Sequence, residues 1–200
     1  MLIQQPIYLA SASPRRHELL KQIDIIHEVL IVPAPAGEDE PIHANESAID
    51  YVQRTAYEKL EHAKQWHAQQ PQLYPWPILC ADTTVELQGQ ILAKPKNLQE
   101  AKAFLQLLSG QEHHVHTAMC LSVGENHYKA LSTSTIRFKP LSPAEIDIYC
   151  QSQEPLGKAG AYGIQGMAAA FVTHLTGSYS GVMGLDLHQT YQLLLNAGLK

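Results

Sequence analysis

One acid, Asp82, stands inside an otherwise apolar run that is typical of a strand, from Ile78 to Leu87. A carboxylate in such a place is costly unless it is paired, bound to a metal or catalytic. A structural alternative is that Asp82 caps a loop or completes a hydrogen-bond network. Lys94 follows the hairpin that this strand begins, so we expect the lysine to return near Asp82.

Small hydroxyl residues and two arginines, Arg15 and Arg16, join a short apolar stretch to a predicted helix. The hydroxyls of Ser11 and Ser13, the N–H groups of the helix N-terminus and two guanidinium groups would meet there. These are the donors that a polyphosphate requires. The alternative is a serine cap followed by a solvated basic turn.

Glycine recurs at every third position from Gly157 to Gly166. Collagen needs this period over many repeats, so we interpret the segment as a backbone that approaches a ligand closely. Lys158 and Gln165 are the polar groups that such a loop would present. A flexible connector is the alternative interpretation.

An acidic cluster, Glu38 to Glu40, follows the second predicted strand. Acids suit a cation, and lysines and arginines suit phosphate oxygens. Together, the acids, the basic residues and the glycine loop predict a site for a metal-chelated polyphosphate.

Several classes of protein are excluded or disfavoured. Fourteen Lys and Arg against 19 Asp and Glu give a net charge of −5, which argues against a nucleic-acid partner. The glycines form no G-x-G pattern and no Walker A motif, and Tyr179 stands where a hydrolase elbow needs serine. His113, His114 and His116 could bind a metal, but we interpret them as surface or hydrogen-bonded histidines.

The compartment follows from cysteine usage and hydropathy. The three cysteines lie far apart without a C-x-x-C pair, which predicts a reduced, cytoplasmic protein. The sequence shows no secretory leader and no run of about 20 apolar residues, so we expect no membrane partner.

Helices and strands alternate along the chain, and two connections look like hairpins, so we predict a mixed α/β fold. We expect one domain over residues 1–200. Ser142 and Glu145 form a predicted capping box, Asn97 with Glu100 a similar start, and Asn45 is expected to cap the long helix. The expected strands are 6–10, 25–32, 78–87, 91–93, 115–123, 128–138 and 169–175, and the expected helices 14–23, 45–70, 97–108, 143–150 and 187–196.

The motifs, taken in order, resemble those of the Maf family of nucleoside triphosphate pyrophosphatases. They run from residue 7 to about residue 195. The strings that carry the resemblance are LASASPRR at 9–16, ADT at 81–83, KP at 94–95, LSG at 108–110 and GKAGAYGIQG at 157–166.

The resemblance implies a mixed, elongated central sheet flanked by helices, with two lobes and a cleft as in inosine triphosphate pyrophosphatases. It implies hydrolysis of a nucleoside triphosphate to the monophosphate and pyrophosphate, with Mg²⁺ or Mn²⁺, and a homodimer. By the same resemblance, Asp82 is the proton acceptor. Our hypothesis is that Asp82 and an acid of the 38–40 cluster, with Glu40 as our choice, hold the metal. The expected substrate-binding residues are Ser13, Arg15, Arg16, Lys59, Thr83, Lys94, Lys158 and Gln165.

Three positions point to a subgroup. Arg15, Thr83 and Gln165 agree with the members that prefer dTTP and UTP, with modified pyrimidine nucleotides as further substrates. The alternatives are a 7-methyl-GTP pyrophosphatase and a non-catalytic nucleotide-binding regulator of septum formation. The chain departs from the family at Gly157, where Asp is common, and at Leu60, where Ala is frequent. The register of its acidic cluster is open, with Glu40 as our choice.

Overall fold

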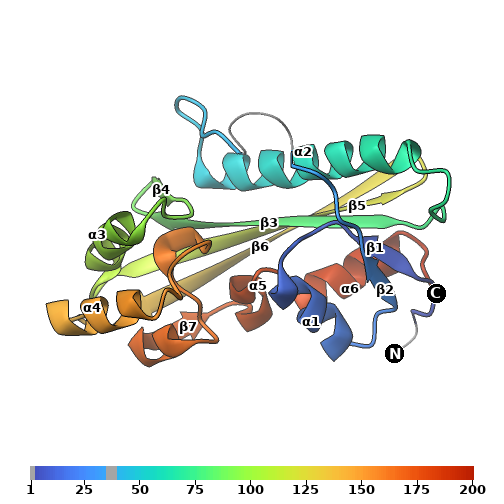
Figure 1. Ribbon diagram of the computed structural model, residues 1–200. Helices are drawn as coiled ribbons and strands as arrows, with labels where there is room; N and C mark the ends of the chain where they lie inside the picture. Colours follow the sequence, from blue (N-terminus) through green and yellow to red (C-terminus); the bar gives the residue numbers. More distant parts are fainter. Residues whose placement is uncertain (1–2, 35–39) are drawn as a thin grey trace.

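A mixed seven-stranded sheet forms the centre of the computed structural model, which describes residues 3–34 and 40–200 (Figure 1). The strand order is β2-β1-β3-β5-β6-β7, and β4 pairs with β3. β1 runs parallel to β2 and β3, and the other pairs are antiparallel, so the predicted mixed sheet is confirmed. The strands are β1 (Ile7–Leu9), β2 (His27–Val29), β3 (Ile78–Leu87), β4 (Gln90–Leu92), β5 (Glu112–Val123), β6 (Asn126–Phe138) and β7 (Val172–Thr176).

Helices cover both faces of this sheet. The long helix α2 lies along one face, α1 and α6 lie on the other, and α3 and α4 lie toward one end of the elongated molecule (Figure 1). The α-helices are α1 (Pro14–Gln22), α2 (Ala48–Ala68), α3 (Leu98–Leu108), α4 (Pro143–Gln151), α5 (Tyr179–Met183) and α6 (Leu187–Asn196). Short 3-10 helices span Ala159–Ala161 and Met167–Phe171. None of the helices within the described ranges has the length and hydropathy that crossing a membrane requires.

Strand β3 is covered on both faces, and its alternation decides where each side chain lies. Ile78 and Cys80 pack in the cluster beneath α2, whereas Leu79 and Ala81 pack in the cluster shared with α1 and α6. Successive side chains of a strand point to opposite faces. Asp82 therefore faces α2, and the next residue faces α1.

Three apolar clusters form the core. One lies between α3, α4 and the ends of the long strands, and the other two lie on opposite faces of the sheet toward α6 and α2. Val85, Ala81 and Leu30 come from different clusters, and all three line the same cleft. The cleft therefore lies where the three clusters meet.

Most predicted elements are confirmed, and three local predictions are wrong. The expected strand 25–32 is limited to His27–Val29. Ser142 and Glu145 form the expected capping box. Ser47 rather than Asn45 caps α2, because the Ser47 side chain accepts from Asp50 N, while Asn45 adopts a positive φ of 61°. The expected strand 169–175 begins only at Val172.

Candidate active site

A single cleft of about 550 Å³ collects all the residues predicted to bind substrate, metal or water. It lies between the turn before α1, helix α2, strand β3 and the glycine loop. Glu38 and Asp39 of the acidic cluster lie outside the described residues. The predicted residues that line the cleft are Ser13, Arg15, Arg16, Glu40, Lys59, Asp82, Thr83, Lys94, Lys158 and Gln165.

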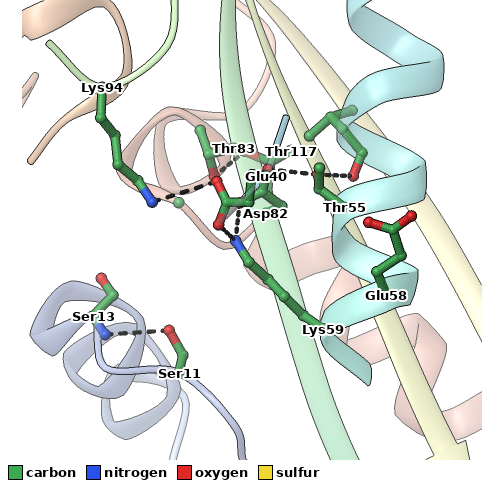
Figure 2. Close-up of polar contacts among 12 residues, drawn as sticks. Ser11, Ser13, Glu40, Thr55, Glu58, Lys59, Asp82, Thr83, Lys94 and Thr117 are labelled. Carbon is green, nitrogen blue, oxygen red and sulfur yellow. Dashed lines mark hydrogen bonds and ion pairs between the residues drawn. The ribbon is translucent and has the colours of Figure 1, made fainter. Parts of the chain in front are cut away.

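Asp82 is 4% exposed and is held by two side chains of α2. Thr55 Oγ1 donates to Asp82 Oδ2 at 2.8 Å, and Lys59 Nζ donates to Oδ1 at 2.6 Å (Figure 2). Burial alone raises the pKa of Asp82, but the charges of Lys59 and Arg16 and the two hydrogen bonds outweigh it, so the pKa lies below the usual value. The carboxylate is therefore ionised and fixed in orientation at neutral pH.

The ammonium of Lys59 bridges two carboxylates. Besides Asp82 it contacts Glu40 Oε1, and Lys94 Nζ lies 3.5 Å from Glu40 Oε2 (Figure 2). Burial lowers the pKa of Lys59, but Asp82 and Glu40 raise it above the usual value. Lys94 thus reaches this acidic pair through Glu40 rather than through Asp82.

Arg16 is fixed by acceptors from three parts of the chain. Its Nε donates to Gly184 O at 2.7 Å, one terminal nitrogen to Ser11 Oγ at 3.2 Å and the other to Thr83 Oγ1 at 3.2 Å. Burial lowers the pKa of Arg16, and the charge of Asp82 opposes that effect. The guanidinium is therefore held in place before any ligand binds.

The hydrogen bonds beyond Arg16 form a directed chain. Thr117 Oγ1 donates to Gly181 O at 2.8 Å, and the two threonine hydroxyls, Thr83 and Thr117, lie 2.9 Å apart. Because each hydroxyl has one hydrogen, Thr83 donates to Thr117 and accepts from Arg16. Thr83 thus connects Arg16 to Thr117 on β5, and through Thr117 to Gly181 on α5.

Two further cationic side chains, Arg15 and Lys158, line the cleft near the start of α1. Ser13 occupies the N-cap position, yet its side chain makes no capping hydrogen bond, and the first turn holds no acid. Burial lowers the pKa of both Arg15 and Lys158, and the charge of Arg15 lowers that of Lys158 further. Among the described lining residues, five are Lys or Arg and two are acids, although the whole chain carries −5. Such a cleft suits an anionic ligand.

A family model described as Maf-like protein matches residues 6–197. The chain belongs to the Maf-like family. A Bordetella pertussis relative named dTTP/UTP pyrophosphatase is 54% identical over 194 residues, which cover 96% of this chain and 93% of the relative. A Haemophilus ducreyi relative named nucleoside triphosphate pyrophosphatase is 41% identical over 198 residues, covering 99% and 98%.

The solved structure of a HAM1 protein from Coxiella burnetii has a similar fold. Its TM-score is 0.50 at 16% identity, and the match covers 96% of this chain and 100% of that chain. At this identity the likeness concerns the fold alone. The expected architecture, a mixed sheet flanked by helices, is therefore confirmed for this Maf-like chain.

The departures from the family pattern have local explanations in this Maf-like chain. Leu60 is fully buried in the cluster beneath α2, so it acts in packing. Gly157 has a positive φ of 72° and offers no side chain to Lys158. The ammonium of Lys158 instead donates to the backbone carbonyl of Glu154.

Two threonines of this site were not predicted from the sequence. Thr55 lies one helical turn before Lys59, and that i, i+4 spacing was an available signal. Thr117 lies opposite Thr83 in the β3–β5 register, which the sequence alone does not specify.

The three clustered histidines make hydrogen bonds. His113 contacts the hydroxyl of Tyr162 at 2.8 Å, and burial with the charge of His114 lowers the pKa of His113 to about 4. His114 and His116 contact threonines of β6. Within the described ranges, no three or more His, Cys, Asp or Glu side chains are grouped so as to hold a metal.

Replacing Thr117 by valine should lower the free energy of unfolding by about 1–3 kcal/mol, because Thr83 and Gly181 O each lose a buried partner. Urea denaturation measures the change. The matched control is Thr173→Val on the exposed strand β7, where we expect a change within about 0.5 kcal/mol. Equal stabilities for the two variants would contradict the directed chain.

Proposed function

We propose that this protein hydrolyses dTTP and UTP to the monophosphate and pyrophosphate and so removes such nucleotides, including modified pyrimidine forms, from the nucleotide pool. The observation that carries the proposal is the buried, ionised Asp82 in a cleft lined by five cationic side chains. The names of the relatives support the substrate class, since several at 47–54% identity are called dTTP/UTP pyrophosphatase.

The donor set suits a divalent cation, which we propose to be Mg²⁺ or Mn²⁺. Glu40 and Asp82 both lie against the Lys59 ammonium, so one positive group already sits between them. Among the described residues, the buried Glu40 Oε1 receives no hydrogen bond beyond this ion pair. Mg²⁺ is usually bound by one or two carboxylates together with substrate phosphates. A cation held there would neutralise charge on the phosphates.

The chain's own residues divide the remaining work. Arg15, Arg16 and Lys158 would bind phosphate oxygens, with the Ser13 hydroxyl as a further donor. Asp82 would accept a hydrogen bond from water and orient it toward the α-phosphorus. The bond from that phosphorus to the bridging oxygen breaks as the water oxygen bonds, and pyrophosphate leaves. Asp82 takes the proton that the attacking water loses, and Lys59 keeps the carboxylate ionised until then.

Recognition of the base would fall to Gln165, which is exposed at the cleft and comes from the glycine loop. Its amide offers one donor group and one acceptor, which match the O4 and N3–H edge of uracil or thymine. Thr83 would act indirectly, because its hydroxyl is occupied by Arg16 and Thr117.

Pyrophosphate release in the presence of Mg²⁺ or Mn²⁺ tests the proposal, measured with dTTP, UTP, CTP, 7-methyl-GTP and ITP. We expect selective turnover of dTTP and UTP. Preference for 7-methyl-GTP would replace the substrate assignment. Nucleotide binding with only stoichiometric pyrophosphate release would instead favour a binding protein.

Two further proposals concern the setting of the enzyme. The cysteines Cys80, Cys120 and Cys150 are unpaired and buried, which supports the cytoplasm as its location. The homodimer expected from the family resemblance stays a prediction, and light scattering coupled to gel filtration measures it.

A further inference from the structure

Glu154, three residues beyond α4, holds the glycine loop from outside the cleft. Its Oε1 accepts a hydrogen bond from the Tyr149 hydroxyl at 3.0 Å, and its Oε2 accepts one from the backbone N–H of Met167 at 3.1 Å. Glu154 is absent from the residues that line the cleft, so it has no direct path to a bound nucleotide.

The same two side chains bind both ends of one turn. Gly163 N donates to the Tyr149 hydroxyl at 3.2 Å, and Gly166 N donates to Gly163 O at 3.0 Å, which closes the turn. Gln165 lies inside this turn. Tyr149 therefore fixes the start of the turn, and Glu154 fixes the residue that follows it.

At two glycines here, a side chain would have to displace a neighbouring side chain. A Cβ at Gly166 would overlap the Glu154 carboxylate, and a Cβ at Gly163 would lie 3.0 Å from Lys158 Cε. The carboxylate thus packs directly against the backbone next to Gln165. This contact gives part of the glycine repeat a physical cause.

We propose that Glu154 is a positioning residue for base selectivity, acting through the turn that carries Gln165. This inference rests on the proposed function, in which Gln165 recognises the pyrimidine. The side chain of Glu154 sets the turn, whereas its backbone carbonyl accepts from Lys158. A side-chain substitution therefore alters the position of Gln165 and leaves the Lys158 hydrogen bond in place.

The first test compares Glu154→Ala with Glu154→Gln by kcat/KM for dTTP, UTP and CTP. Alanine removes both acceptors, so we expect the selectivity for dTTP and UTP over CTP to fall about tenfold or more. Glutamine can accept from Met167 N and donate to the Tyr149 hydroxyl, so it should restore selectivity to within about threefold. Uniform loss of kcat/KM for all three nucleotides would indicate a merely structural role and overturn the proposal.

A double-mutant cycle locates the effect at Gln165. Gln165→Ala alone should reduce selectivity, and adding Glu154→Ala should reduce it no further, because both act on the same contact. Additive losses would overturn the proposal. The control is Glu125→Ala, an exposed glutamate in the turn between β5 and β6, which should leave selectivity unchanged.

Hydrogen exchange separates this inference from the proposed function. In Glu154→Ala, the amides of the 163–167 segment should exchange faster while those of β3 and β5 keep their protection. If the wild-type protein turns over neither dTTP nor UTP, the proposed function fails, and the selectivity role fails with it. If the wild type is selective and the alanine variant equally so, only the role of Glu154 fails. Should the alanine variant not fold, Tyr149→Phe, which removes the shared hydroxyl, must show the same loss of selectivity.

Discussion

Asp82→Asn should lower kcat for dTTP and UTP by about 10²- to 10⁴-fold, the range expected for loss of a positioned acid–base group. An amide cannot take a proton from water, and it places an N–H group where Asp82 now accepts from Lys59 or Thr55. Steady-state pyrophosphate release measures kcat, and circular dichroism checks that the variant folds.

The control for this substitution is Glu58→Gln. Glu58 precedes Lys59 on α2, but its side chain points away from Asp82 (Figure 2). It pairs with Arg54 instead. It should keep kcat within about twofold, since exposed ion pairs contribute little. A folded Asp82→Asn enzyme with kcat near that of the wild type would refute the role of Asp82.

Lys59→Met should lower the free energy of unfolding at pH 7 by about 3–5 kcal/mol, the cost of breaking a buried ion pair. Two carboxylates, Asp82 and Glu40, then share a buried region without the ammonium that separates them. Denaturant unfolding measures the loss. The control is Lys102→Met on α3, whose exposed pair with Asp147 should contribute little to stability, so this variant should unfold close to the wild type.

The pH dependence of the same variant has a defined sign. In the wild type the pKa of Asp82 is lowered in the folded state, so its stabilising contribution is complete above about pH 4 and is lost as pH falls through that lowered pKa. Without Lys59, burial should raise the pKa of Asp82, and the variant should gain stability as the carboxyl becomes protonated. The difference in unfolding free energy should therefore shrink as pH falls. A constant difference would contradict the placement of the charge.

The proposed metal predicts a second measurable effect of Lys59→Met, on the melting temperature. A divalent cation could replace the ammonium between the two carboxylates, so Mg²⁺ or Mn²⁺ should raise the melting temperature of this variant more than that of the wild type. No rise in the melting temperature of either protein would argue against a cation site formed by Asp82 and Glu40.

The sequence predicted the long elements and the residues of the cleft, because their signals are local. An acid inside an apolar run and arginines at a helix start need no knowledge of the fold to be noticed. Contacts between distant segments could not be predicted in this way. Thr117 is recognised as a neighbour of Thr83 only when β5 is paired with β3. The carbonyl oxygen of Gly184, which accepts from Arg16, lies 168 residues along the chain.

Helix α5 escaped prediction because it is five residues long and contains Gly181. Its stability comes from contacts that local propensity does not report, including the Ser178 cap and the bond from Thr117 to Gly181 O. Asn45 and Ser47 are both good capping residues, so local preference could not separate them. Glu46 lies between these two residues and forms an ion pair with Arg54 at 2.6 Å. The side chain that caps the helix is that of Ser47.

The long strands beneath the cleft have a mechanical consequence. β3, β5 and β6 run for 10, 12 and 13 residues along the sheet as one continuous hydrogen-bonded ladder. Bending the molecule across these strands would strain or break that ladder, so the floor of the cleft behaves as a stiff plate rather than a hinge. Any adjustment to a nucleotide must therefore come from the segments that pack on these strands, while Asp82, which lies on β3, keeps its place in the floor through turnover.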